Sequence, residues 1–151
     1  MVIGFRCSNS DYSYAILEGD KKNPKIITSN TTSFPKNFER QSELKWFYQE
    51  LDDLFKKYQI NSIGIKGTEV PDQNGNSFIC RVENEAMIFL CASNNGITKI
   101  SRKVKATIAK DLCSKGKAKY LQTELNLDDI ENYTKSADKI NEAILVAWSH
   151  L

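Results

Sequence analysis

The sequence has few of the residues that hold transition metals. Its 151 residues include a single histidine, His150, and four cysteines that form no Cys-x-x-Cys pair. Structural zinc sites use four Cys or His ligands, usually with two of them close together in the chain. A metal centre of that kind is therefore not expected. We interpret the cysteines as small buried apolar residues in a reducing compartment, and they are Cys7, Cys80, Cys91 and Cys113.

Long apolar segments are also missing. No run approaches the roughly 20 apolar residues that a membrane-spanning helix needs. The first residues lack the basic region, apolar core and small-residue cleavage site of a secretion signal. We therefore expect no association with a membrane and a cytoplasmic location.

The chain has no strong excess of charge of either sign. It contains 21 Lys and Arg residues against 19 Asp and Glu residues, for a net charge of +2. This balance permits nucleic-acid binding but does not argue for it, because dedicated binders usually carry a pronounced basic patch. The hydrophobic content of 40% and charged content of 26% are ordinary for a soluble globular protein. The length fits one domain, residues 1–151.

The start of the chain predicts three short strands joined by tight turns. Residues 2–7 open with the apolar run VIGF, and residues 11–18 and 24–30 are again rich in aromatic and β-branched side chains. The connecting segments, SNSD and GDKKN, contain Ser, Asn, Asp and Gly, which form turns readily. Such short connections favour antiparallel pairing of the three strands.

Helices and strands alternate in the next part of the chain. Apolar side chains recur at helical spacing in residues 41–59, and residues 61–66 then predict a buried strand. A helix between two strands predicts that residues 2–7 and 61–66 are parallel neighbours joined by a right-handed crossover. Residues 78–94 predict a second helix and residues 97–101 a fifth strand. The expected buried face of this second helix consists of Phe78, Val82, Ala86, Phe89, Leu90 and Ser93.

The clearest local bias of charge lies in residues 102–119, which hold seven basic residues and one acid. Basic side chains in such a segment can contact phosphates without reading a nucleotide sequence. A solvated helix surface is the alternative interpretation. The candidate nucleic-acid-binding residues are Arg102, Lys103, Lys105, Lys110, Lys115, Lys117 and Lys119. Residues 136–151 then predict a C-terminal helix.

Several short motifs resemble the RuvC family of Holliday-junction resolvases. The pattern Ile-Gly-x-x-x-Ser at Ile3, Gly4 and Ser8 is similar to the opening of that family. Residues 142–150, EAILVAWSH, resemble its closing motif, and residues 104–105 and 116–119 resemble its Val-Lys and Gly-x-Ala-x-Lys segment. The resemblance implies an α/β, ribonuclease-H-like fold: a five-stranded mixed sheet in the order 3-2-1-4-5 with helices on both faces. A looser similarity to an uncharacterised bacterial branch of resolvase-like proteins implies the same fold and no particular activity.

The positions of the family's metal-binding acids carry different residues in this chain. The resemblance assigns those acids to Arg6, to Lys66 or Gly67, and to Glu142, with Asp138 one helical turn from Glu142. Two-metal nucleases hold Mg²⁺ through several carboxylate oxygens, and cationic side chains would repel the ions instead. We therefore expect a degenerate nuclease site without a metal or other cofactor. An ion pair between Arg6 and Glu142 is expected to fill it.

Three classes of function remain open. The first is a non-catalytic RuvC-like domain that serves as an accessory subunit, bound weakly and without sequence preference to DNA or RNA, or to a protein complex. The second is a Mg²⁺-dependent endonuclease with relocated acids, for which the available carboxylates are Glu69, Glu83, Glu85, Asp138 and Glu142. The third is a structural or regulatory homodimer without nucleic acid. We favour the first, with Arg6, Lys66 and Glu142 converging at one end of the sheet.

Overall fold

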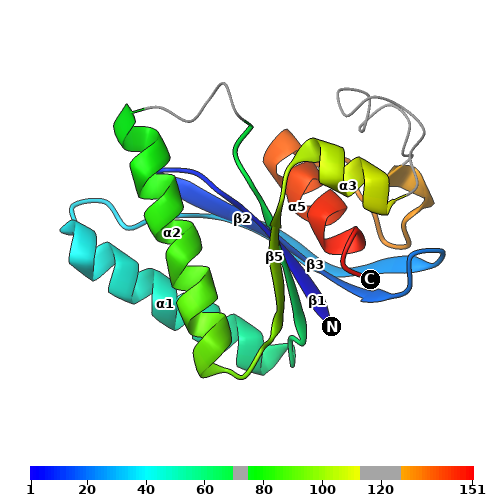
Figure 1. The fold of residues 1–151 in the computed structure, drawn as a ribbon, viewed down its shortest axis with the longest axis horizontal. Coiled ribbons are helices and arrows are strands. Elements are labelled where there is room, and N and C mark those ends of the chain that lie inside the picture. The colour runs from blue at the N-terminus through cyan, green and yellow to red at the C-terminus, as the bar shows by residue number, and fades with distance from the viewer. Residues whose placement is uncertain (70–74, 113–126) are drawn as a thin grey trace.

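The computed structural model describes residues 1–69, 75–112 and 127–151 and contains a mixed sheet of five strands (Figure 1). The strands are β1 (Val2–Cys7), β2 (Asp11–Gly19), β3 (Pro24–Ser33), β4 (Ser62–Lys66) and β5 (Lys99–Lys103). Their order is β3-β2-β1-β4-β5, with β1–β2 and β2–β3 antiparallel and β1–β4 and β4–β5 parallel. This arrangement confirms the predicted sheet and places β1 at its centre.

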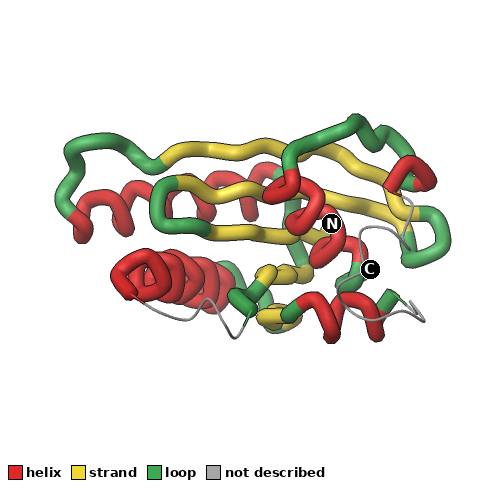
Figure 2. Tube along the Cα trace, turned by 90° about the horizontal axis from the view of Figure 1, so that it is seen from above, coloured by secondary structure: helices red, strands yellow, loops and turns green. Residues whose placement is uncertain are grey.

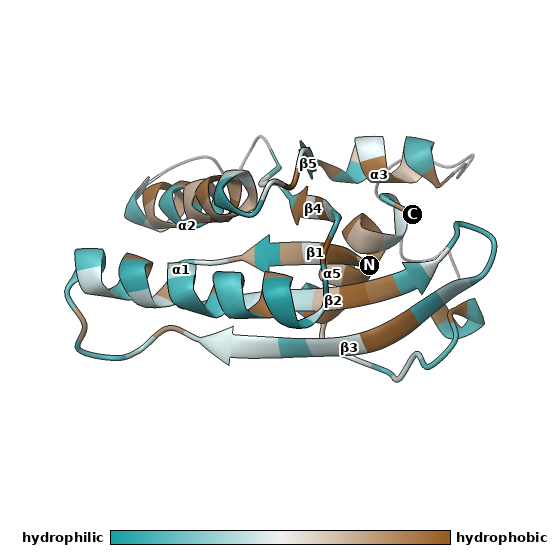
Figure 3. Ribbon diagram, turned by 90° about the horizontal axis from the view of Figure 1, so that it is seen from below, coloured by the Kyte–Doolittle hydropathy of each residue, from teal (hydrophilic) through white to brown (hydrophobic). Residues whose placement is uncertain are grey.

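Helices cover both faces of this sheet. α1 (Arg40–Lys57) and α2 (Gly75–Asn94) pack on the face that receives Ile3, Phe5 and Cys7 of β1. α5 (Asp138–Trp148) packs on the other face, and α3 (Lys105–Asp111) packs in turn on α5. Because neighbouring side chains of a strand point to opposite faces, Arg6 is directed toward α5. The apolar parts of β2 and β3 lie in the region that α5 covers (Figure 3).

Two glycines allow α5 to lie directly against the sheet. A Cβ atom at Gly4 would stand 2.1 Å from the carbonyl oxygen of Ala143, and one at Gly64 would stand 2.8 Å from that of Val146. Any larger residue would push the helix away, because backbone atoms cannot move aside as a flexible side chain can. Gly4 and Gly64 therefore fix α5 over β1 and β4, and with it the position of Glu142.

The two chain ends lie at the opposite end of the sheet from the candidate site. Figure 2 shows the N- and C-termini side by side, and Met1 and Leu151 line the same surface depression. β1 runs away from this depression and ends at Cys7, and β4 runs parallel to it and ends at Lys66. The carboxyl ends of these two strands therefore meet at the far edge of the sheet.

The prediction for the buried face of α2 was wrong. Val82, Phe89 and Leu90 are exposed, whereas Arg81 and Glu85 are buried. The complete buried set is Arg81, Asn84, Glu85, Ile88, Cys91 and Ala92. The periodicity identified the more apolar stripe, but the start of the helix turns toward the ends of β1 and β4, where polar side chains have partners. Ion pairs and hydrogen bonds make the burial of these polar groups tolerable.

The end of α2 also explains why β5 begins two residues later than predicted. Gly96 has a φ of 68°, and the N–H of Ile97 donates to the carbonyl oxygen of Ala92 at 2.9 Å. These are features of a helix-ending turn closed by a left-handed glycine. Ile97 therefore belongs to the turn, although its β-branched side chain suits a strand.

The cysteines that the structure describes are free thiols. Cys7 and Cys91 are buried and Cys80 is half-buried, while Cys113 lies outside the described residues. Burial raises the pKa of the Cys91 thiol to about 11, so this side chain is protonated and unreactive at neutral pH. Within the described residues, no helix is both long and apolar enough to cross a membrane.

Candidate functional site

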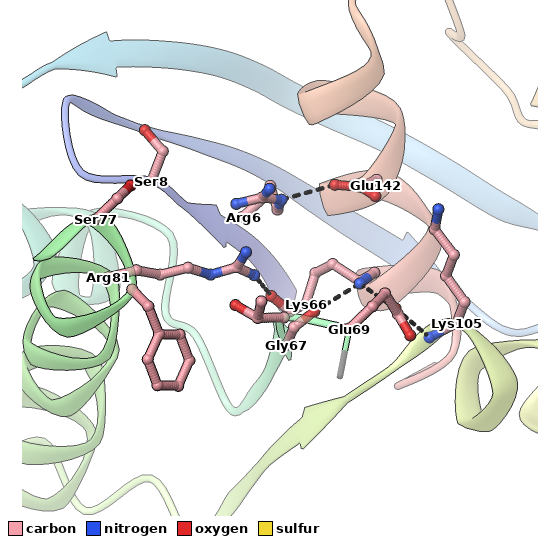
Figure 4. Close-up of a pocket in the computed structure, with 11 residues that line it drawn as sticks. Arg6, Ser8, Lys66, Gly67, Glu69, Ser77, Arg81, Lys105 and Glu142 are labelled. Carbon is pink, nitrogen blue, oxygen red and sulfur yellow. Dashed lines mark hydrogen bonds and ion pairs between the residues drawn. The ribbon is translucent and has the colours of Figure 1, made fainter. Parts of the chain in front are cut away.

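Arg6, Lys66 and Glu142 line one pocket at the carboxyl ends of β1 and β4 (Figure 4). The pocket has a volume of about 320 Å³. Arg6 comes from the end of β1, Lys66 from the end of β4 and Glu142 from the first half of α5. The three positions therefore lie together at one end of the sheet, as expected from the sequence. The remaining lining residues are Ser8, Gly67, Thr68, Glu69, Ser77, Phe78, Arg81 and Lys105.

Arg6 and Glu142 form an ion pair across the pocket. Nε of Arg6 lies 2.7 Å from Oε2 of Glu142, and the two side chains are 21% and 18% exposed. The guanidinium also donates to the backbone carbonyl of Cys7. A charge-assisted contact of this length is among the stronger hydrogen bonds in proteins. The carboxylate that the resemblance aligns with a metal ligand is thus already neutralised by a side chain.

Lys66 provides a second cation at the neighbouring strand end. Its side chain is only 4% exposed and is 2.7 Å from Oε1 of Glu69. Nζ also donates to the carbonyl oxygen of Gly67 at 2.6 Å. Burial alone would raise the pKa of Glu69, but hydrogen bonds from Lys66 and from the backbone N–H of Lys105 hold it below its usual value. Glu69 is therefore ionised at neutral pH and committed to these two partners.

Arg81 is the residue of this pocket that the sequence interpretation missed. It reaches from the first half of α2, where Nε lies 2.9 Å from Oε1 of Glu85, and it donates to the carbonyl oxygen of Lys66. The second oxygen of Glu85 lies 2.5 Å from Nε of Arg102. Burial, together with the nearby charge of Arg6, lowers the pKa of Arg81. The only signal in the sequence was the Arg-x-x-x-Glu spacing of residues 81 and 85, which also occurs on many exposed helix faces.

The oxygen donors of the site do not fit a pair of divalent cations. Mg²⁺ and Mn²⁺ require several oxygen ligands around each ion, yet cationic residues outnumber carboxylates by four to two in the lining of this pocket. Within residues 1–69, 75–112 and 127–151, no three Asp, Glu, His or Cys side chains are grouped so that they could hold a metal ion. Of the five carboxylates named for a relocated site, Glu69 and Glu142 line this pocket, and each pairs with a cation. The other three lie elsewhere: Glu83 pairs with Arg40, Glu85 pairs with two arginines, and Asp138 is exposed and outside the pocket.

The basic residues that the structure describes in residues 102–111 differ in their surroundings. Arg102 pairs with Glu85 and lies over the ring of Phe89. Lys103 is held by Asp111 at 2.8 Å and by the backbone carbonyl of Ser149. Lys105 lines the pocket and Lys110 is exposed. The other three candidates, Lys115, Lys117 and Lys119, lie outside the described residues.

Comparison with known proteins gives structural neighbours only. No protein-family model and no curated protein matches the chain. Among solved structures, Thermus thermophilus RuvC in complex with a Holliday-junction substrate superposes with a TM-score of 0.76 at 7% identity, covering 99% of this chain and 90% of that one. The yeast mitochondrial Holliday-junction resolvase Ydc2 superposes with a TM-score of 0.62 at 14% identity, covering 98% of this chain and 76% of that one. Fowlpox virus resolvase with its Holliday-junction DNA superposes with a TM-score of 0.52 at 16% identity, covering 99% of this chain and 97% of that one.

These superpositions extend over almost the whole chain and share its sheet. At such low identity they establish the fold and leave the activity open. The five-stranded mixed sheet in the order β3-β2-β1-β4-β5 agrees with them. The chain has the ribonuclease-H-like fold of the RuvC-like Holliday-junction resolvases.

Proposed function

We propose that this protein is a non-catalytic RuvC-like domain that associates with nucleic acid as an accessory subunit. The observation that carries the proposal is the Arg6–Glu142 ion pair, with the buried ammonium of Lys66 at the neighbouring strand end. These side chains occupy the positions to which the sequence resemblance assigns metal-binding acids. The pocket lies where the resemblance places the family's acidic site, but cationic side chains stand at two of its three positions.

The charges of this pocket support a function without metal-dependent chemistry. A unit charge repels a divalent cation 4 Å away by about 8 kcal/mol at an effective dielectric constant of about 20. The single carboxylate of Glu142 offers an attraction of the same size, and Arg6 already cancels it. The Lys66–Glu69 pair offers no net attraction, because each charge neutralises the other and the carboxylate of Glu69 is already engaged. An ion that activates a water molecule for phosphodiester hydrolysis has no favourable place here.

The nucleic-acid part of the proposal is supported by charge and by the neighbours. Thermus thermophilus RuvC and fowlpox virus resolvase were both solved with Holliday-junction DNA, and both share this fold. The cationic pocket opens at an end of the sheet and suits a phosphate backbone better than an uncharged ligand. Contacts of this type depend on salt and not on sequence.

Cleavage and binding assays on the same substrates test the proposal. The full chain is incubated with labelled four-way junctions, duplexes and single strands of DNA and RNA in Mg²⁺ or Mn²⁺. We expect intact substrates and a binding isotherm that weakens steeply as salt is raised. Cleavage by the wild-type protein that disappears in Glu142→Ala would overturn the non-catalytic claim. Absence of any binding at low salt would overturn the nucleic-acid claim.

A second candidate, self-association, is favoured by the apolar stripe on α2. Ile79, Val82, Phe89 and Leu90 are all exposed there, and the exposed fraction of Ile79 reaches 55%. Apolar surface concentrated on one face of a helix usually marks an interaction site. A second copy of the chain is the simplest occupant, because two identical stripes can cover each other around a two-fold axis, the commonest symmetry of homo-oligomers.

A further inference from the structure

We propose that the pocket beside the Arg6–Glu142 pair is an anion site that binds a phosphate group directly, through Arg6, Arg81, Lys66 and Lys105. This inference rests on the proposed function, because the phosphate it assigns is one of the nucleic-acid backbone. It goes further by naming the chemical group, the side chains that hold it and the absence of a bridging metal.

Within the described residues, the cations of this pocket keep hydrogen-bond donors that have no protein partner. An arginine side chain has five N–H groups and a lysine ammonium has three. Arg6 uses donors on Glu142 and on the backbone of Cys7, and Arg81 uses donors on Glu85 and on the backbone of Lys66. Lys66 uses two of its three. Within the described residues, the ammonium of Lys105 has no hydrogen bond or ion pair.

Two of these cations are more than nine-tenths buried. Lys66 is 3% exposed and Arg81 is 7% exposed, and both line the pocket. Buried charge is costly unless opposite charge is close by. Among the described residues, the lining has four cations and two carboxylates, Glu69 and Glu142, and Glu85, the partner of Arg81, is shared with Arg102. Proximity of Arg6 already lowers the pKa of Arg81, after the effect of burial itself. A dianionic or monoanionic oxyanion between the two guanidinium groups would relieve this repulsion.

The shape of the donors favours phosphate. Planar guanidinium groups present paired N–H donors that match two oxygens of one phosphate. Arg6 comes from β1 and Arg81 from α2, and their guanidinium groups lie near each other in Figure 4. Ser77 and Phe78 at the start of α2 also line the pocket, so the positive end of the helix dipole lies beside it. The volume of about 320 Å³ leaves room for the sugars on either side of a phosphodiester.

Two lysines of α3 provide a matched pair of variants. Lys105 lines the pocket, whereas Lys110 is exposed at the other end of the same helix. Lys105→Gln and Lys110→Gln each remove one positive charge, and neither ammonium belongs to an ion pair within the described residues. Thermal melts of both variants should match that of the wild type, since single exposed or half-exposed charges contribute little to stability.

Affinity for a single-stranded oligonucleotide is measured in EDTA, with inorganic phosphate as a competitor. We expect Lys105→Gln to weaken binding about tenfold, as for the loss of one charge-assisted hydrogen bond, and Lys110→Gln to weaken it about twofold or less. Mg²⁺ in place of EDTA at equal ionic strength should not strengthen the affinity, because a divalent cation can only compete with the protein for the phosphates. Equal losses in the two variants, or binding that requires Mg²⁺, would overturn the direct phosphate site while the nucleic-acid association itself would stand.

A spectroscopic arm tests the pocket independently of nucleic acid. The Nε–H resonances of Arg6 and Arg81, assigned with Arg→Lys variants, are followed while inorganic phosphate is added. We expect both to shift in the wild type and in Lys110→Gln, and to shift at higher phosphate concentration in Lys105→Gln. Shifts without oligonucleotide binding would support a site for free phosphate and refute the proposed nucleic-acid role. Resonances that do not move at any phosphate concentration would overturn the site.

Discussion

Among single residues, Arg6 and Glu142 matter most, because their ion pair takes the place of a metal site. The pair is about one-fifth exposed on each side, so it lies between a surface salt bridge and a buried one. Replacing one residue of the pair leaves the other half-buried and charged, without an opposite charge beside it. Replacing both with neutral polar residues leaves an uncharged polar contact. The stability of single and double variants therefore distinguishes a structural pair from two independent charges.

We expect Arg6→Gln to lower the free energy of unfolding by about 1–3 kcal/mol. Adding Glu142→Gln should recover part of that loss, which gives a coupling energy of about 0.5 kcal/mol or more. Chemical denaturation of the four proteins of the cycle measures it. The Lys56–Asp52 pair is the control, because Lys56 is 66% exposed and its pair should show almost no coupling. Equal coupling in the two cycles would contradict a special role for Arg6–Glu142.

His150 predicts a pH dependence with a defined sign. Its ring lies 3.3 Å from the Ser62 hydroxyl and 3.1 Å from the Ser101 hydroxyl. Burial, and then the charge of Lys103, lowers the pKa of His150 to about 4. The unfolded chain therefore binds the extra proton between about pH 6.5 and pH 4, and stability falls as pH drops through this window.

We expect the free energy of unfolding to fall by about 2–3 kcal/mol between pH 7 and pH 4 because of His150 alone. The His150→Asn variant removes this contribution, so its stability curve should be flatter in that range. The pKa values of Asp11, Glu69 and Asp111 are also lowered. The stabilisation that these carboxylates contribute is lost at lower pH, as they become protonated, and it is lost equally in both proteins. Parallel curves for wild type and His150→Asn would show that the ring is protonated as easily in the fold as outside it.

The sequence predicted which strand ends and which helix meet at the pocket. Connection lengths made β1 and β4 parallel neighbours, and the family resemblance aligned Arg6, Lys66 and Glu142 with one site. It did not predict Arg81 or the separate role of Lys105. Both depend on which charged side chains of α2 and α3 are directed at the pocket, and hydrophobic periodicity gives no information about the orientation of charged side chains. Lys103 illustrates the same limit, since a lysine in a basic segment turns out to be held by Asp111 and Ser149.

At the scale of elements, the contact of α5 with β1 and β4 sets the geometry of the pocket. Gly4 lies against backbone atoms of Ala143 and Ala147, while Gly67 lies against the flexible side chain of Arg102. We expect Gly4→Ala to destabilise the protein by about 1–3 kcal/mol or more, as in an overpacked core, and Gly67→Ala to have a much smaller effect. Denaturation midpoints of the two variants measure this. Similar losses would mean that α5 can shift away from β1 freely.

α2 shows why the apolar pattern misled the prediction of burial. The stripe of Val82, Phe89 and Leu90 is more apolar than the face that packs on the sheet, yet it is exposed. The buried face begins with Arg81 and Glu85, which are satisfied by each other and by Lys66 and Arg102. A pattern-based reading assumes that the most apolar face is inside, and it fails where the interior is a polar site.

At the scale of the whole molecule, this exposed stripe predicts self-association. We expect the wild-type protein to show the mass of a dimer by sedimentation at micromolar concentrations, and Val82→Asp/Leu90→Asp to be monomeric with an unchanged melting temperature. Phe38→Asp is the control, since Phe38 is 51% exposed but lies in the loop before α1. A monomeric wild type, or dissociation by Phe38→Asp alone, would remove the support for a homodimer through α2.

The overall topology was predictable because it follows from local rules. Short turns require antiparallel neighbours, and a helix between strands gives a right-handed parallel crossover. These rules gave the antiparallel pairing of the first three strands and the parallel pairing of β1 with β4, and the family resemblance supplied the complete order β3-β2-β1-β4-β5. The chemistry of the pocket does not follow from the topology, since the neighbours of this fold share 7–16% of their residues with the chain. Function therefore has to be argued from Arg6, Lys66 and Glu142.

The most direct test of the central claim is a titration of the protein with Mn²⁺, with free Mn²⁺ measured by electron paramagnetic resonance. We expect the wild-type protein to bind no Mn²⁺ at this pocket, and Arg6→Asp/Lys66→Glu, which places carboxylates beside Glu142, to gain a site. A far-ultraviolet spectrum of the double variant checks that it is folded. Stoichiometric Mn²⁺ binding by the wild type that is lost in Glu142→Gln would contradict the account.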